Sequence, residues 1–326
     1  MIIARSPLRI TLGGGGTDLP SYYREYEGFV ISAAIDKYVY VCINKPYKSG
    51  IFLRYSKIEE VKKISDINHN IIREVLLLKH KSISKIEITT LSDIPAGTGL
   101  GSSGSFSTAM IKAFYGFLEK KISQDKLARL ACEIEIDKLN APIGKQDQYI
   151  SAIGGITCFK FFKNDNVKYF PLKLSLKTQT ELESNLVLYF TGYSRNANDI
   201  LKHQKEQCEK NNKDIFNNLH YIKNLGLQTK NALENGKTKI FGEIMNEHWK
   251  YKKKRLIKMS NEKIDYFYDF AIKNGAIGGK LIGAGGGGFL MFMASDKDKL
   301  RKNLTKIGLQ EVGFKFDMNG TKIINL

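Results

Sequence analysis

The glycine-rich segment from Pro95 to Ser105 is the part of this sequence whose residue types point most directly to chemistry. It lies between an expected strand and a helix that begins at once. Backbone amides at a helix N-terminus carry partial positive charge, and glycines let a phosphate approach the chain closely. We therefore predict a phosphate-binding loop in which the nucleotide contacts Pro95, Gly97, Gly99, Leu100, Gly101, Ser102, Ser103, Gly104 and Ser105.

Two other kinds of nucleotide loop fit this segment less well. A Walker A loop ends in Gly-Lys-Ser/Thr, which the segment lacks. Gly99, Gly101 and Gly104 do match GxGxxG, but a dinucleotide site also needs a second strand ending in an acidic residue about 20 residues on. Here the helix leads into another helix instead. A dinucleotide site and a tight helix-packing turn are the alternatives to the phosphate loop.

Three motifs, in order along the chain, resemble those of the GHMP kinases, the group that contains galactokinase, homoserine kinase, mevalonate kinase and phosphomevalonate kinase. Ser6–Asp18 resembles the first motif, Pro95–Ser105 the nucleotide-binding motif and Lys280–Phe289 the third, so the resemblance covers the whole chain. It implies an α+β fold of two domains. Residues 1–165 would form a domain like ribosomal protein S5 domain 2 with the ATP and Mg²⁺ site, and residues 166–326 a ferredoxin-like domain.

The resemblance also assigns roles to single residues. The family's Mg²⁺ ligands correspond to Ser103 and Glu135, the carboxylate beside the acceptor hydroxyl to Asp147, and the motif-one cation to Arg9. This set is chemically sufficient with ATP and Mg²⁺, because phosphoryl transfer depends mainly on positioning and charge neutralisation. Mg²⁺ takes few protein oxygens, and a carboxylate can accept the hydroxyl proton. The alternatives are an exposed loop acid for Asp147 and a surface salt bridge for Arg9.

The first motif departs from that of galactokinase, which has Gly-Glu-His-Thr-Asp where Gly14–Asp18 reads Gly-Gly-Gly-Thr-Asp. The sugar pocket must therefore differ. This form, together with Gly144–Gln148 and Thr191–Arg195, resembles the D-glycero-D-manno-heptose 7-phosphate kinases, whereas L-fucose kinases carry a Trp near the position of Gly16. The resemblance implies phosphorylation of a heptose 7-phosphate at O1, with a neutral sugar such as L-fucose as the alternative acceptor.

A sugar phosphate needs cationic donors far from the reacting hydroxyl. Candidates are Lys145, Arg195, Lys253 and Lys254, and Arg195 is favoured because it follows an expected strand in a Gly/Ser turn. The run Gly285–Gly288 should bring backbone close to ligand or to the phosphate loop. The residues predicted to contact substrate are Gly14, Gly15, Gly16, Thr17, Asp18, Lys145, Arg195, Gly285 and Gly286.

The elements that must position these residues interleave without the strict βα repeat of a doubly wound sheet or barrel. Hydrophobic periodicity and turn residues separate the segments. Strands are expected at 1–12, 28–34, 38–44, 51–55, 85–91, 156–162, 185–191 and 289–294. Helices are expected at 67–80, 105–119, 124–139, 200–234 as one or two helices, 241–254, 262–274 and from 295 onward.

The formal net charge of +18 raises the question of a nucleic-acid partner. Most lysines are scattered, and the one dense run, Lys250–Lys258, lacks an array of aromatic residues, so we interpret it as a solvated helix face. Nucleic-acid or anionic-surface binding is an alternative, as is a non-catalytic sugar sensor, which the retained Arg9, Glu135 and Asp147 disfavour. No apolar run suits a signal peptide or membrane span, and the four cysteines are far apart. We expect a soluble cytoplasmic protein with reduced thiols, a small-molecule substrate, and neither a nucleic-acid nor a membrane partner.

Overall fold

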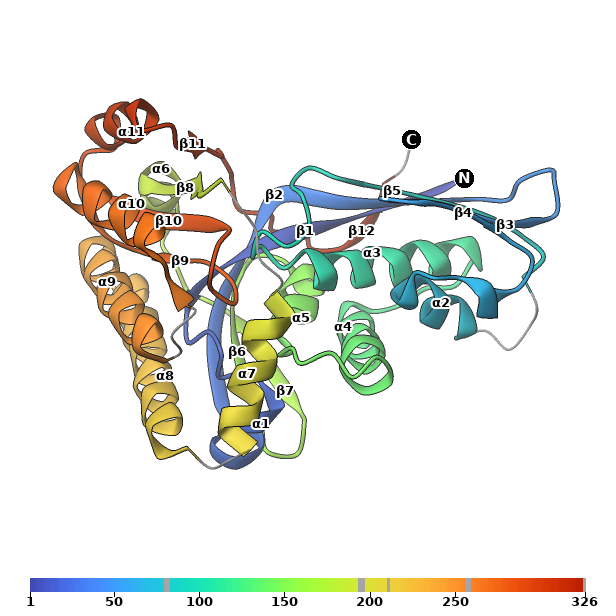
Figure 1. The fold of residues 1–326 in the computed structure, drawn as a ribbon, viewed down its shortest axis with the longest axis horizontal. Helices are drawn as coiled ribbons and strands as arrows, with labels where there is room; N and C mark the ends of the chain where they lie inside the picture. Colours follow the sequence, from blue (N-terminus) through green and yellow to red (C-terminus); the bar gives the residue numbers. More distant parts are fainter. Residues whose placement is uncertain (79–82, 193–196, 210–211, 256–258, 325–326) are drawn as a thin grey trace.

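The computed structural model describes residues 1–78, 83–192, 197–209, 212–255 and 259–324. Within these ranges the chain forms two mainly antiparallel sheets, and helices pack against each of them (Figure 1). The α+β architecture predicted from the sequence is therefore confirmed. The two sheets meet where the three glycine-rich segments lie, so the fold brings together loops that are far apart in sequence.

The larger sheet has the order β12-β1-β2-β5-β3-β4, with β6 paired to β2 and β7 paired to β6. Neighbouring strands are antiparallel except β3 and β5, which are parallel. Alternation places Ile86 and Ile88 of β5 in the core while their neighbours are partly exposed, as expected for a sheet with one covered face. The strands are β1 (Ile2–Gly13), β2 (Gly28–Asn44), β3 (Gly50–Arg54), β4 (Ile58–Val61), β5 (Lys85–Ser92), β6 (Ile156–Phe161), β7 (Val167–Pro171) and β12 (Lys322–Ile324).

Strand β2 joins two segments that the sequence predicted as separate strands. It runs without a break because β1 pairs with both halves of it, with a register shift between Pro7 and Leu8. On its other side β2 pairs first with β6 and then with β5. This long central strand carries the core of the larger sheet along its whole length.

Helices on one face of the larger sheet hold the residues predicted for the nucleotide site (Figure 1). Helix α3 fits closely between strands and helices, because small residues such as Ala109 and Ala113 alternate with the fully buried Met110 and Phe114. The predicted helix at 124–139 is α4 continued by a π-helical segment, η2. These elements are η1 (Ile64–Asp66), α2 (Asn70–Leu77), α3 (Ser102–Phe117), α4 (Gln124–Cys132), η2 (Glu133–Lys138) and α5 (Gln146–Ile153).

The smaller sheet has the order β11-β8-β10-β9. Its strand β10 is buried on both faces, with Phe292 in a cluster with Trp249 and with Met291 in a cluster with Phe241. Helix α9 contributes both aromatic residues and packs along β9. The elements are α6 (Leu176–Asn185), β8 (Leu186–Phe190), α8 (Lys213–Glu234), α9 (Thr238–Arg255), α10 (Glu262–Lys273), β9 (Ala276–Leu281), β10 (Phe289–Ala294), α11 (Lys297–Lys306) and β11 (Gln310–Glu311).

The two halves of the chain are connected more closely than a single boundary suggests. The boundary predicted at residue 165 falls in the turn between β6 and β7, and β7 still belongs to the larger sheet. Strand β12 also returns to this sheet and pairs with β1. Two further helices, α1 (Pro20–Tyr26) and α7 (Ala197–Glu209), contact each other across the halves.

Candidate active site

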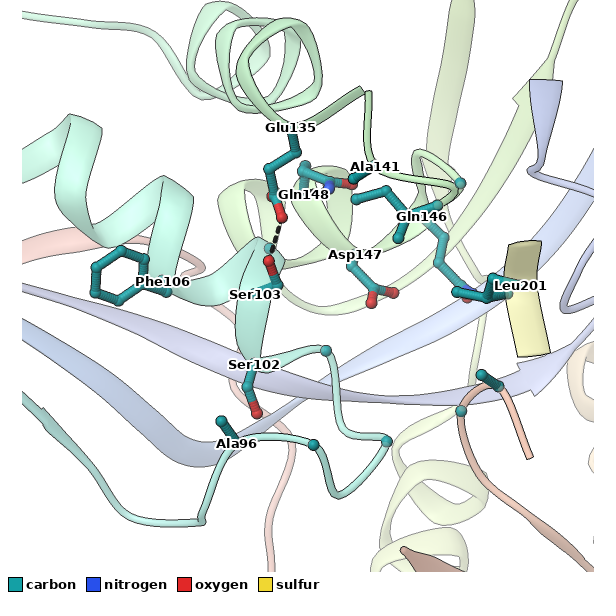
Figure 2. Close-up of a pocket in the computed structure, with 18 of the residues that line it drawn as sticks. Ala96, Ser102, Ser103, Phe106, Glu135, Ala141, Gln146, Asp147, Gln148 and Leu201 are labelled. Atoms are coloured by element: carbon teal, nitrogen blue, oxygen red, sulfur yellow. Dashed lines mark hydrogen bonds between the residues drawn. The ribbon is translucent and has the colours of Figure 1, made fainter. Parts of the chain in front are cut away.

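A cavity of about 1260 Å³ lies where the three glycine-rich segments meet. The cavity is lined by Gly15 and Gly16 of the first segment, by most of the loop between Ala96 and Gly104, and by residues 281–284 of the third segment. Figure 2 shows Asp147 near the middle of the site, with Phe106 toward one side and Leu201 of α7 toward the other. The cavity is thus long enough to present different chemistry at its two ends.

The predicted phosphate loop leads directly into the start of α3. Gly101 takes the position before the first helical residue at a φ of 79°, a left-handed conformation that favours glycine. The first-turn amides of α3 therefore face the cavity with the positive end of the helix dipole. Gly104 must also lack a side chain, because a Cβ there would lie 2.8 Å from the Cβ of Asp147. This glycine lets the carboxylate of Asp147 approach the loop.

Arg9 and Asp147 form a paired cation and acid at the centre of the cavity. Arg9 Nε donates to Asp147 Oδ1 at 2.7 Å and its Nη2 donates to Oδ2 at 3.0 Å. Arg9 Nη1 also donates to the carbonyl of Gly99, which ties the pair to the phosphate loop. Arg9 is only 4% exposed, so a surface salt bridge does not describe it. The bidentate pair fixes the direction in which the carboxylate faces the cavity.

Ser103 and Glu135 lie side by side at the start of α3 (Figure 2). Ser103 Oγ donates to Glu135 Oε2, and Gln148 Nε2 donates to Glu135 Oε1 at 2.9 Å. Glu135 belongs to η2, where the Leu139 amide donates to the Ile134 carbonyl five residues back. Such π-helical turns often occur at functional sites. Burial raises the pKa of Glu135.

The Ser103 hydroxyl and the Glu135 carboxylate fit the requirements of a magnesium ion. Mg²⁺ prefers hard oxygens and usually takes one or two from protein, with phosphate and water oxygens completing its shell. A serine hydroxyl and a carboxylate beside a phosphate-binding loop meet that requirement. Among the described residues no group of three or more His, Cys, Asp or Glu could hold a metal by protein ligands alone.

The first glycine-rich segment is divided between ligand-facing and structural residues. Asp18 lines the cavity and accepts hydrogen bonds from the amides of Gly16 at 3.1 Å and Gln146 at 3.2 Å. Burial, followed by the nearby Asp147 carboxylate, raises the pKa of Asp18. Thr17 is fully buried and does not line the cavity, since its hydroxyl donates to the carbonyls of Gly14 and Phe29. Gly14 likewise packs on the Phe29 carbonyl.

Several other predicted contact residues also have structural positions. Leu100 is buried in the core and its carbonyl accepts from the Arg9 amide at 2.9 Å. Ser105 Oγ donates to the Pro7 carbonyl. Gly285 and Gly286 pack on Met259 and do not line the cavity, and the same is true of Pro95. From the third glycine-rich segment, Gly283 and Ala284 line the cavity instead.

Three of the four predicted phosphate-binding cations lie outside this cavity. Lys145 donates to Asp165 Oδ1 at 3.1 Å in a separate, smaller pocket, because it precedes α5 and faces away from Asp147. Lys253 Nζ pairs with Asp265 at 2.9 Å, and Lys254 is exposed with its ammonium over the Tyr251 ring. Arg195 lies outside the described residues.

The cavity instead presents three buried cations, of which the two on α9 belong to the run that the sequence interpretation treated as a solvated face. Lys252, Arg255 and Lys280 line it and are 7%, 6% and 2% exposed. A signal for the two α9 cations was present in the sequence, because Phe241, Met245, Trp249, Lys252 and Arg255 recur at a spacing of three or four residues. Lys252 and Arg255 therefore lie on the same buried side of the helix as its apolar residues.

These features together can bind a nucleotide phosphate chain, hold a divalent cation and place a carboxylate beside an acceptor hydroxyl. They define a small-molecule phosphotransferase site. No helix among the described residues has the length and apolar character needed to cross a membrane.

Comparison with known proteins gives the family. The model of the GHMP kinases N terminal domain matches residues 69–155, and that of the GHMP kinases C terminal region matches residues 229–308. A D-glycero-alpha-D-manno-heptose 7-phosphate kinase from Campylobacter jejuni is 32% identical over 98% of this chain and 97% of its own. The chain belongs to the GHMP kinase family.

Two further relatives are informative. The crystal structure of a D-glycero-D-manno-heptose 1-phosphate kinase from Bacteroides thetaiotaomicron has a TM-score of 0.83 at 29% identity, covering 100% of this chain and 99% of its own. An L-fucokinase/L-fucose-1-P guanylyltransferase from Bacteroides fragilis is 28% identical over 94% of this chain but only 36% of its own. The predicted two-domain GHMP kinase fold is confirmed, and the chain is a kinase of this family.

Proposed function

We propose that this protein transfers the γ-phosphoryl group of ATP to O1 of D-glycero-D-manno-heptose 7-phosphate, giving the heptose 1,7-bisphosphate. The observation that carries the kinase chemistry is the Asp147 carboxylate, held by Arg9 at the mouth of the phosphate loop. The sugar identity is supported by the heptose phosphate kinases among the relatives and by the Gly-Gly-Gly-Thr-Asp form of the first motif. Because the reaction uses ATP, we place it in the cytoplasm, as a step toward nucleotide-activated heptose for surface polysaccharide.

In the proposed reaction the O1 hydroxyl attacks the γ-phosphorus while the bond to the β–γ bridging oxygen breaks and ADP leaves. Asp147 accepts the hydroxyl proton, a contribution of about 10²–10⁴ in rate for a positioned base. Arg9 keeps that carboxylate oriented and adds positive charge near the transferred group. Asp18 and the backbone of Gly15, which both line the cavity, position the sugar.

Ser103 and Glu135 would hold Mg²⁺ beside the phosphate loop. A bound Mg²⁺ supplies charge neutralisation at the nucleotide phosphates. Gln148 keeps the Glu135 carboxylate turned toward Ser103 by donating to its second oxygen. The α3 amides provide a second source of positive potential for the same phosphates.

The test is an ADP-release assay on the purified protein with a panel of acceptors. It compares heptose 7-phosphate with heptose 1-phosphate, neutral heptose, L-fucose, galactose and mannose 6-phosphate. We expect the highest kcat/KM for heptose 7-phosphate, with a product that carries phosphate at C1 by ³¹P NMR. A neutral sugar used at least as efficiently would reject the substrate and leave an anomeric sugar kinase. Equal inactivity with all six acceptors would reject sugar phosphorylation.

A further inference from the structure

Three buried cations line the cavity on the side of α7 and α9. Lys280 lies on β9, and Lys252 and Arg255 lie one turn apart on α9. Cations are favoured in the last turn of a helix, but that preference does not require them to be buried. Removing three charges from water is costly unless each is neutralised. Their burial therefore needs another explanation.

The described partners of these cations are neutral. Lys252 Nζ donates to the carbonyls of Leu281 at 2.9 Å and Gly283, and Lys280 Nζ donates to the Leu12 carbonyl at 2.8 Å. Within the described ranges, no carboxylate forms an ion pair with either lysine. Burial and then the neighbouring cations lower both pKa values, that of Lys280 to about 7.

Arg255 retains a free donor. Its Nε donates to Asn218 Oδ1 at 3.0 Å and its Nη1 donates to Gln204 Oε1 at 3.3 Å. Its Nη2 has no hydrogen-bond partner among the described residues, and the same holds for Nε2 of Gln204. Gln204 is 2% exposed, so both orphan N–H groups are buried. Two buried, unpaired donors side by side indicate a missing acceptor.

Arg255 and Gln204 lie beside the first glycine-rich segment, where the sugar is proposed to bind. A Cβ on Gly16 would lie 2.6 Å from Arg255 Nη1, so the guanidinium sits against the first glycine-rich segment. Burial lowers the pKa of Arg255 to about 10, and Cys208 and then Asp18 partly oppose this shift. Leu201, one turn before Gln204, lies on the opposite side of Asp147 from Ser102 (Figure 2). Helix α7, which also carries Gln204, therefore lies across Asp147 from the start of α3, where the nucleotide phosphates are expected.

We propose that Arg255 and the Gln204 amide bind the phosphate that the sugar already carries, with Lys252 and Lys280 as neighbouring amines that the bound dianion keeps protonated. This proposal deepens the proposed function, since it assigns the part of the site that distinguishes a sugar phosphate from a neutral sugar. A phosphate dianion accepts bidentate hydrogen bonds from a guanidinium and neutralises the cluster. The subsite is fixed by α7 and α9, so it is built from the C-terminal half of the chain.

The decisive variant is Gln204→Glu. The new carboxylate has the shape of the amide but would pair with Arg255 in the empty enzyme and repel a phosphate. We expect a higher melting temperature without ligand and a KM for heptose 7-phosphate raised about 10- to 100-fold, as for loss of a hydrogen bond to a charged group. The KM for ATP should stay at the parent value. A purely structural role for Gln204 would not combine a more stable empty protein with selectively weaker sugar-phosphate binding.

Arg255→Gln tests the same subsite from the other partner, and Lys254→Gln is the matched control on the exposed side of α9. Arg255→Gln should lower the ratio of kcat/KM for heptose 7-phosphate over neutral heptose by about 10- to 100-fold, and Lys254→Gln should leave it unchanged. Equal loss with both sugars, or an increased KM for ATP in either subsite variant, would overturn the proposal.

A binding measurement separates failure of the subsite from failure of the proposed function. Without nucleotide, heptose 7-phosphate and mannose 6-phosphate should raise the melting temperature of the parent protein more than that of Gln204→Glu. If the parent does not turn over heptose 7-phosphate but shows this difference, the function is wrong and the subsite stands. If both proteins shift equally, the subsite is wrong whatever the turnover.

Discussion

Replacing Asp147 by Asn tests the proposed base with little change in shape. The amide cannot accept the hydroxyl proton, so we expect kcat to fall by at least about 100-fold, which corresponds to about 3 kcal/mol of activation free energy. ATP affinity should be nearly unchanged, because the phosphate loop and Ser103 do not depend on the carboxylate charge. Turnover is measured by ADP release and ATP affinity by displacement of a fluorescent nucleotide.

The structure also sets the expected effect of Asp147→Asn on stability. Breaking a fully buried ion pair costs about 3–5 kcal/mol. The Asp147 side chain is 26% exposed, so the pair is not fully buried. In the variant Arg9 still donates to the Gly99 carbonyl and can donate to the side-chain oxygen of the new asparagine. Loss of the charge also removes a repulsion on Asp18. We therefore expect a loss of about 1–2 kcal/mol in the free energy of unfolding, too small to unfold the protein.

The matched control is Asp165→Asn, which removes a carboxylate that is also bound by cations, here Lys145 and Arg24, but outside the cavity. Its turnover should remain within about twofold of the parent, as for most surface changes. Near-normal turnover in Asp147→Asn would remove this residue from the chemistry. An equal loss in the Asp165 variant would show that the assay reports stability rather than catalysis.

Three further predictions concern the metal, the loop contact and the buried charge. Ser103→Ala and Glu135→Gln should each raise the Mg²⁺ concentration for half-maximal rate by roughly tenfold or more, and parent-like titrations would reject the metal site. Gly283→Ala would place a Cβ 2.5 Å from the facing Cα of the phosphate loop, so activity should fall sharply, whereas Gly313→Ala, with open space around it, should behave like the parent in the same assay. Because burial lowers the pKa of Lys280 to about 7, from 10.5, the unfolded chain holds a proton that the folded protein lacks between those pH values. Stability should rise with pH across that window, and Lys280→Met should flatten the rise by roughly 1 kcal/mol per pH unit in urea unfolding; an unchanged slope would contradict the buried-charge argument.

The parts of the site that could be predicted are those whose chemistry is encoded locally. Glycines between a strand and a helix can serve few purposes, so the glycine-rich loop and its junction with α3 follow from the sequence. Residues that act through backbone contacts were harder to separate from ligand-facing ones. Thr17 has a polar side chain in a motif, yet its hydroxyl holds the segment together, and only the tertiary contacts reveal this.

Proximity in sequence to the proposed base Asp147 was misleading for Lys145. Two positions apart at the start of a helix, side chains point in different directions, and Lys145 therefore reaches Asp165 while Asp147 faces the cavity. The continuity of β2 was missed for a related reason. Local turn signals between residues 34 and 38 suggested a break, but pairing with β1 on one edge keeps the strand extended.

The net charge of +18 had suggested anionic partners without saying where they would bind. In the structure many exposed lysines pair with carboxylates or stand in water, where salt screens them and each contributes little. The buried cations Lys252, Arg255 and Lys280 lie in a cavity wall, where the same charge acts through a lower effective dielectric. Position rather than number therefore decides which positive charges recognise a ligand. Such charges can be identified in a sequence when a cation occupies a helical position where an apolar residue is expected. In α9 this pattern distinguishes Lys252 and Arg255 from the exposed Lys254 between them.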